Sequence, residues 1–230
     1  MPLIVKRSKR YLEDAKKVPA NPVAIDAAID AVKGFKATKF DQSVELIVSL
    51  GIDAKQADQA VRGSISLPHG IGKTNRVICF CQDHLAEQAK AAGAVRAGGQ
   101  ELVAAIEKEN FTDFDVAIAT PDMMRFVGRL GKVLGPKGLM PSPKAGTVTP
   151  DITKAIREYV AGKIEFRNDT GGNVHCVVGK QSFDKPKLSD NVNAMLAQLR
   201  KMKPSTSKGA YIKKAVLKGS MTPAVVLDVH

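Results

Sequence analysis

The apolar residues of this chain change their pattern twice, and the two patterns require two different kinds of sheet. In the middle, residues 77–81 (VICFC) form a continuous apolar run, as expected for a strand that is buried on both faces. A second such run, 116–119, follows after two segments with helical periodicity, 83–92 and 99–109, and a weak strand at 94–95. Strands that alternate with helices across short connections predict a small parallel sheet of the doubly wound, Rossmann-like type.

The two ends of the chain have another pattern. Six segments there are short, rich in β-branched residues and bounded by turn residues, as strands are: 43–50, 63–67, 163–167, 173–178, 211–217 and 224–229. The third and fourth of these are expected to form a hairpin across a glycine-containing turn. One long helix, 187–203, has basic residues at its C-terminal end, where the helix dipole favours them. Hairpins with one long helix do not make a parallel sheet, so both ends are expected to share an antiparallel α+β sheet.

The fold class that follows is mixed α/β and α+β, with two domains. An antiparallel α+β domain built from both chain ends, residues 1–68 plus 160–230, is interrupted by a Rossmann-like parallel α/β domain, residues 69–159. The boundaries are placed at the glycine- and proline-containing breaks around 68–72 and at Gly162. Further helices are expected at 1–17, from Asn21–Pro22 onwards, over the polar segment 54–60, and at 151–161.

The charge of the chain points to a polyanionic partner, because the formal net charge is +12. Residues 1–68 hold 11 Lys and Arg against 8 Asp and Glu, residues 69–159 hold 12 against 10, and residues 160–230 hold 12 against 5. The two ends together therefore carry +10 and the middle only +2, which assigns the polyanion to the domain built from the ends. A membrane partner is disfavoured, because no run of about 18 apolar residues exists.

The N-terminus and the cysteines fit a reducing cytosol. The basic N-terminal segment lacks the apolar core of a signal peptide, and Glu13 and Asp14 argue against a transit peptide. Three cysteines are an odd number in a chain of 230 residues, which indicates free thiols and no disulfide framework.

Two motifs suggest small-molecule chemistry, and neither is complete. Residues 70–74 (GIGKT) end like a phosphate-binding loop, but the pattern needs a glycine where Leu67 stands, and a strand follows instead of a helix. Cys79, Cys81 and His84 lie close together, but no second ligand pair has zinc spacing. No nucleophile has a visible histidine partner, and no paired carboxylates stand out. No catalytic residue, metal site or cofactor is therefore predicted, and the chain is not expected to be an enzyme.

The polyanion is expected to be a folded RNA. Aromatic residues make up 5% of the chain and tryptophan is absent, so few rings are available for stacking on single-stranded bases. A basic α+β surface is better suited to recognising backbone, 2′-hydroxyl groups and shape.

One stretch carries a family resemblance. Residues 123–150 contain five cations and no acidic residue, and four prolines and five glycines exclude a long regular element. Apolar residues interleave with the basic ones, so the stretch is expected to be an ordered loop. Residues 128–151 (GRLGKVLGPKGLMPSPKAGTVTPD) closely resemble the signature segment of the large-subunit ribosomal protein L-one family, bacterial type, and the similarity extends over nearly the whole chain.

The resemblance implies the same two-domain arrangement, with a hinge near 68–72 and 159–162, and it implies a function. Proteins of this family are structural constituents of the large ribosomal subunit in the cytoplasm. They bind large-subunit rRNA to form the mobile stalk near the exit site, assist release of deacylated tRNA, and in bacteria commonly repress translation of their own messenger RNA. The implied partners are that rRNA, exit-site tRNA and the messenger, with no membrane and no cofactor. Two alternatives stay open: a nucleotide-binding α/β enzyme with an accessory domain, and a free-standing translational repressor.

The resemblance also implies which residues contact RNA. They match three segments of the family: Lys39, Phe40, Ser43, Arg167, Asp169, Thr170, Gly172, His175, Ser220, Met221 and Thr222. Thr170 replaces a lysine of the family pattern and Thr222 replaces a glycine, so a cationic contact and a close backbone approach are in question at these positions.

The residues alone leave alternatives at four of these positions. A core position is the favoured alternative for Phe40 and an equal one for Met221. Asp169 and Gly172 are equally well explained as residues that form the turn of a hairpin.

Overall fold

The computed structural model describes residues 7–56, 58–109 and 111–229. These residues gather into two compact units. Unit 1 takes the described chain up to Val61, the short segment Leu67–Gly72, and the chain from Phe166 onwards. Unit 2 consists of Arg62–Ser66 and Lys73–Glu165. Both ends of the chain build one unit and the middle builds the other, and the predicted fold class is confirmed.

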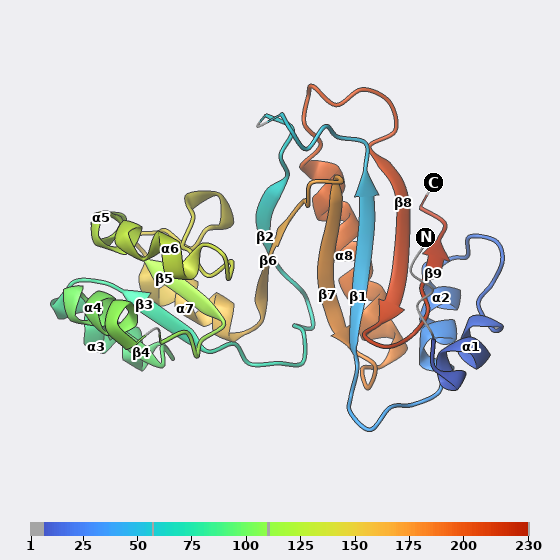
Figure 1. Cartoon of the computed structure of the whole chain (residues 1–230), viewed down its shortest axis with the longest axis horizontal. Helices are drawn as coiled ribbons and strands as arrows, with labels where there is room; N and C mark the ends of the chain where they lie inside the picture. The colour runs from blue at the N-terminus through green and yellow to red at the C-terminus, as the bar shows by residue number, and fades with distance from the viewer. Residues whose placement is uncertain (1–6, 57, 110, 230) are drawn as a thin grey trace. The chain divides into compact units, whose positions relative to one another are not determined.

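Unit 1 is organised by a four-stranded antiparallel sheet in the order β7–β1–β8–β9 (Figure 1). Its strands are β1 (Ser43–Leu50), β7 (Asn173–Lys180), β8 (Ile212–Gly219) and β9 (Val225–Leu227). Strand β1 comes from the N-terminal part of the chain, and its partners come from the C-terminal part. In the register, Ile47 lies opposite His175 of β7 and Val216 of β8.

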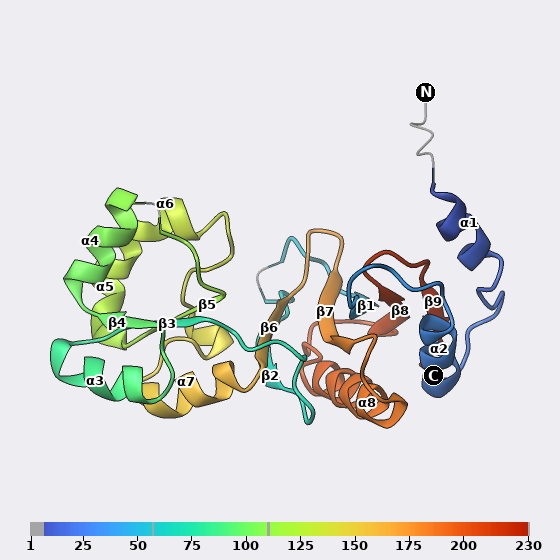
Figure 2. The same ribbon diagram turned by 90° about the horizontal axis from the view of Figure 1, so that it is seen from below.

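One face of this sheet is covered by helices. Helices α2 (Ile25–Lys33) and α8 (Lys185–Lys201) contact each other and pack on strands of the sheet (Figure 2). Side chains alternate along β1, so that the even-numbered ones are buried and the odd-numbered ones are half-buried. We call the half-buried side of the sheet the open face; on β1 it carries Ser43, Glu45, Ile47 and Ser49.

A short N-terminal helix, α1 (Lys9–Ala15), also belongs to unit 1. Ser8 caps it, because its hydroxyl accepts a hydrogen bond from the backbone N of Tyr11 (3.2 Å). Asp14 is buried and accepts from the backbone N of Lys36 (3.1 Å), which fixes α1 to the segment that follows α2.

Unit 2 contains a three-stranded parallel sheet in the order β4–β3–β5 (Figure 1). The strands are β3 (Val77–Phe80), β4 (Arg96–Gly98) and β5 (Val116–Ala119). Strand β3 sends alternate side chains into two cores. One core is shared with α3 (Asp83–Ala91) and α7 (Ile152–Val160). The other is shared with α4 (Gln100–Glu109), α5 (Met124–Val127), the 3-10 turn η2 (Gly128–Leu130) and α6 (Gly131–Leu134).

The predicted hairpin is wrong. Strand β6 (Lys163–Arg167) pairs with β2 (Arg62–Ser66) in a separate two-stranded sheet. Next to the turn that follows β6, a bridge links Asn168 to Val174, and the backbone N of Asp169 donates to the Asn173 carbonyl (2.8 Å). The reason is a non-local clamp: Asn168 bonds to Val61 through its backbone N (3.0 Å) and its side-chain oxygen (2.8 Å), which aligns β6 with β2.

Other elements also differ from the prediction. Helix α2 begins at Ile25, after the start predicted at Asn21–Pro22. The reason is that Val23 pairs with β9, where the backbone N of Val23 donates to the Val226 carbonyl (3.1 Å). The described residues of 54–60 form turns, because so short a polar segment buries too little to stabilise a helix. The weak strand predicted at 94–95 lies instead at 96–98.

Candidate nucleic-acid interface

The predicted RNA-contacting residues all lie in unit 1, in two groups. The first group stands just before β1, at its start, and in the turn between β8 and β9: Lys39, Phe40, Ser43, Ser220, Met221 and Thr222. The second group lies between β6 and β7 and on β7, with Arg167 as the last residue of β6: Arg167, Asp169, Thr170, Gly172 and His175. Ser43 pairs with Lys180 and Ser49 with Asn173, so the groups lie at opposite ends of the sheet, about 20 Å apart along β1.

Hydrogen bonds connect the parts of the first group that lie at the start of β1 and in the β8–β9 turn. The backbone N of Ser220 donates to the Ser43 carbonyl (3.0 Å), and the backbone N of Met221 donates to the side-chain oxygen of the buried Gln42 (2.9 Å). Lys180 Nζ donates to Ser43 Oγ (2.9 Å). The start of β1, the β8–β9 turn and the end of β7 therefore form one connected platform.

Two apolar side chains project from this platform. Phe40 and Met221 are each 54% exposed. The alternative that either side chain is part of the core is therefore wrong. An exposed ring beside a cation such as Lys39 is suited to stacking on a base or ribose.

Thr222 has a structural role. Its side chain is buried, and its hydroxyl accepts from the backbone N of Gly219 (2.8 Å) and donates to the Pro223 carbonyl (3.1 Å). These bonds close the β8–β9 turn that carries Met221. The threonine that replaces the glycine of the family pattern thus shapes the turn with a side chain that points inward.

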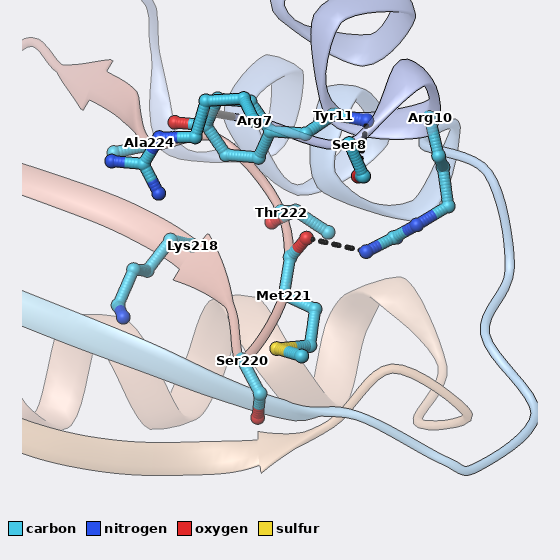
Figure 3. A pocket seen from close by; sticks show the side chains of 9 residues that line it. All are labelled: Arg7, Ser8, Arg10, Tyr11, Lys218, Ser220, Met221, Thr222 and Ala224. Carbon is cyan, nitrogen blue, oxygen red and sulfur yellow. Dashed lines mark hydrogen bonds between the residues drawn. The ribbon is translucent and has the colours of Figure 1, made fainter. Parts of the chain in front are cut away.

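A cavity of about 410 Å³ beside this turn is lined by the predicted residues of the turn and by cations that the sequence analysis missed (Figure 3). Arg10 Nη2 donates to the Met221 carbonyl (2.9 Å), 211 positions away in sequence. The Arg7 guanidinium lies 4.8 Å from the centre of the Tyr11 ring, and Lys218 adds a third cation from β8. The only sequence signal for the N-terminal cations of this cavity was the density of positive charge in the N-terminal segment. No local pattern indicates that this segment contacts the β8–β9 turn.

Two members of the second group form the β6–β7 turn. The Asp169 carboxylate accepts from the backbone N of Asn173 (2.7 Å) and of Gly171 (2.9 Å), which holds the pKa of this carboxyl below its usual value. Gly172 has a φ of +77°, and its carbonyl accepts from the backbone N of Leu50 (2.9 Å). Both residues therefore have the turn role considered as an alternative, and their RNA contacts stay a prediction.

The remaining members of the second group are exposed. Arg167, Thr170 and His175 all have exposed side chains, and His175 Nε2 lies 3.7 Å from the Asp169 carboxylate. Lys214 lies opposite Ser49 in the register, so it adds a cation to the open face at this end of the sheet. The arrangement gives each end of the open face cations for phosphate groups.

Comparison with known proteins shows the family of the chain. A family model described as the ribosomal protein L1p/L10e family matches residues 32–223. The chain belongs to this family. The resemblance read from the sequence is confirmed.

Similar proteins align with almost the whole length of this chain. Three similar proteins are named large ribosomal subunit protein uL1: those of Kosmotoga olearia (52% identical), Thermosipho africanus (50%) and Thermosipho melanesiensis (48%). Each match covers 97% of this chain and 96–97% of the relative. They are named as ribosomal proteins and not as enzymes, so the enzyme alternative is not supported.

The excess positive charge of this L1p/L10e protein is concentrated in unit 1. Counted over the sequence, unit 1 holds 21 Lys and Arg against 12 Asp and Glu, and unit 2 holds 14 against 11. Their net charges are therefore +9 and +3. A polyanion is attracted more strongly to unit 1.

The small-molecule motifs have structural explanations. Residues 70–74 lead into β3 and not into a helix N-terminus, so the phosphate-binding-loop alternative is wrong. Cys79 and Cys81 are fully buried, and burial raises the pKa of both thiols. Among the described residues, no group of three or more His, Cys, Asp or Glu side chains is placed to hold a metal ion. In the same part of the chain, no helix has the length and apolarity needed to cross a bilayer.

Proposed function

We propose that this protein is a component of the large ribosomal subunit and binds large-subunit rRNA through the open face of unit 1. The names of its relatives support the first part. One structural observation supports the second: cations and two exposed apolar side chains from distant parts of the chain gather on one connected platform. Such a protein works on the ribosome, in the cytoplasm.

The proposal extends to what the bound protein does. We infer that the complex with rRNA forms the mobile stalk near the exit site and assists release of deacylated tRNA. We also infer that the free protein represses translation of its own messenger RNA by binding a similar RNA structure. Membership of the L1p/L10e family is the support for these finer parts. In this proposal residues 1–68 and 160–230 anchor the protein, and the inserted domain, 69–159, is the moving arm.

Single substitutions test the RNA site. Lys39→Ala and Arg167→Ala are each expected to weaken binding of a large-subunit rRNA fragment roughly 3- to 10-fold. Each loss of a phosphate contact is also expected to reduce the slope of log affinity against log salt by about one unit. Lys201→Ala removes an exposed cation from α8, on the covered face, and is the matched control. Equal losses in all three variants would contradict binding at the open face.

Co-sedimentation with large subunits separates a ribosomal component from a free-standing repressor. We expect the protein to travel with the large subunit at physiological salt. A protein that binds its messenger but not the subunit would support the repressor alternative. A footprint of the protein on large-subunit rRNA would then locate the RNA site.

A further inference from the structure

The cavity of about 410 Å³ between α1 and the β8–β9 turn has a lining of two kinds (Figure 3). Three of the lining residues are cations: Arg7, Arg10 and Lys218. Three others are apolar or aromatic: Tyr11, Met221 and Ala224. None of the described residues that line this cavity is acidic. We call it the α1 cavity. Its volume lies within the range of roughly 300–1,000 Å³ that is usual for small-molecule sites.

The α1 cavity is already formed in the absence of a ligand, because α1 is fixed from two sides. Asp14 Oδ1 accepts from the backbone N of Lys36 (3.1 Å), and Arg10 Nη1 donates to the carbonyl of the same lysine (3.3 Å). Arg10 Nη2 donates to the Met221 carbonyl (2.9 Å). These bonds hold α1 against both the segment before β1 and the β8–β9 turn. A ligand therefore enters a site whose walls are in place.

Two of the three cations have no carboxylate partner in the described part of the chain. Arg10 donates to carbonyl oxygens, and the Arg7 guanidinium lies 4.8 Å from the centre of the Tyr11 ring. Lys218 is different, because its Nζ lies 3.2 Å from the carboxylate of Glu45 on β1. The α1 cavity therefore keeps an excess of positive charge, which attracts an anionic group.

The remaining lining suits a flat ring. Figure 3 shows Arg7 and Tyr11 on one side of the cavity and Met221 on the other. Aromatic rings and guanidinium planes are the groups on which unstacked bases lie in RNA-binding proteins. A simple anion would leave Tyr11 and the 54% exposed Met221 facing water, and an apolar ligand would leave the cations desolvated without a partner. The ligand that fits has both an anionic group and a flat ring.

We propose that the α1 cavity binds one nucleoside phosphate, with its phosphate group held by the cations and its base between Tyr11 and Met221. The inference rests on the proposed function, in which RNA binds beside this cavity, and adds to it a site for a single nucleotide. Two sources present the same groups: one unit of the bound RNA that has left the stack, or a free nucleotide in solution. The experiment below distinguishes them.

Binding of free nucleotides to the full chain tests the site without RNA. We expect UMP and AMP each to bind with a Kd of about 0.1–1 mM, measured by calorimetry. Inorganic phosphate, uridine and adenosine are the matched probes, because each carries only one part of the ligand. We expect each of them to bind at least about tenfold more weakly than the nucleotides. Equal Kd values for a nucleotide and either of its parts would overturn the inference.

Variants of α1 locate the binding in the cavity. Arg7→Ala is expected to raise the Kd for UMP at least about fivefold, because the charge and the planar group are both lost. Arg7→Lys keeps the charge and should give an intermediate Kd. Lys9→Ala is the matched control, since Lys9 is an exposed cation of the same helix outside the cavity lining. It should leave the Kd unchanged, and equal losses in Arg7→Ala and Lys9→Ala would overturn the site.

A large-subunit rRNA fragment identifies the source of the nucleotide. If a saturating fragment prevents UMP binding, and Arg7→Ala weakens binding of the fragment more than Lys9→Ala does, the cavity holds a nucleotide of the RNA. If UMP binds the RNA complex with an unchanged Kd, the cavity holds a free nucleotide. Circular dichroism of each variant confirms that it is folded.

The outcomes separate this inference from the function on which it rests. A folded wild-type protein that binds UMP but not the rRNA fragment contradicts the proposed function and leaves the nucleotide site standing. A wild-type protein that binds the fragment but neither UMP nor AMP overturns the inference alone.

Discussion

Single residues in the candidate interface divide according to whether the side chain points outward or builds a turn. Phe40 and Met221 are exposed, whereas Thr222 is buried and Gly172 has a left-handed backbone. The family resemblance identified the segments but not these separate roles. The sequence could not separate them, because the partner that fixes Met221 is Gln42, which is 179 positions away.

The hydroxyl of Thr222 is expected to stabilise unit 1. Thr222→Val keeps the shape of the side chain but leaves the backbone N–H of Gly219 without its acceptor. We expect the free energy of unfolding to fall by about 1–3 kcal/mol. Urea unfolding with an unchanged m-value measures this. Thr222→Ser retains the hydroxyl, so its free energy of unfolding should fall clearly less. Equal urea midpoints for the wild type and the valine variant would contradict the role assigned to the hydroxyl.

The carboxyl of Asp169 is expected to make the β6–β7 turn sensitive to acid. Its pKa is lowered from 3.8 by the N–H groups of Asn173 and Gly171. A lowered pKa gives stability that is fully present above the unfolded value and is lost as the pH falls through the folded one. We therefore expect the NMR shifts of the Gly171 and Asn173 amides to change below pH 3.8. Asp169→Asn should abolish that change.

At the scale of elements, local periodicity predicted most helices and strands but not which of them are neighbours. The buried runs at β3 and β5 required a parallel sheet, and the alternating pattern of β1 required one covered face. The pairing of β6 with β2 depends on the clamp between Asn168 and Val61, which no local pattern reveals. The same holds for α1, whose contact with the β8–β9 turn joins opposite ends of the chain.

The position of α1 is expected to affect RNA binding through Arg10. Arg10→Ala removes the hydrogen bonds to the carbonyls of Met221 (2.9 Å) and Lys36 (3.3 Å), so the β8–β9 turn loses a support. We expect affinity for the rRNA fragment to fall roughly 3- to 10-fold, by an amount larger than for Lys9→Ala. Lys9→Ala removes the same charge from an exposed position on the same helix. Equal losses would indicate that charge alone matters and that the support of the turn does not.

At the scale of the whole molecule, the division of the chain into two units places the segment of the predicted hinge near 68–72 inside unit 1. Asn191 of α8 is buried, donates to the Gly70 carbonyl (2.9 Å) and accepts from the backbone N of His69 (3.2 Å). The segment Leu67–Gly72 is thereby fixed within unit 1. If the proposed arm moves, we expect the pivot on this side to begin after Gly72.

Removal of most of unit 2 is expected to leave specific rRNA binding largely intact. We would replace residues 73–165, which are all of unit 2 except Arg62–Ser66, by a short glycine–serine linker, since unit 1 carries +9 of the net charge and the whole candidate interface. Filter binding with the specific rRNA fragment and an unrelated RNA of the same length measures affinity and specificity. Circular dichroism confirms that the shortened protein is folded. Loss of specific binding by a folded shortened protein would contradict the assignment of the interface to unit 1.

The pairing of β1 with β7 and β8 has a consequence for synthesis. A polypeptide leaves its ribosome N-terminus first, and β1 must wait until the partner strands that end at Lys180 and Gly219 have emerged. The parallel sheet of unit 2 and its helices are complete once Val160 is out, so unit 2 is expected to fold first on the growing chain. An unfinished polypeptide therefore has no assembled platform, and only a nearly complete one can capture RNA.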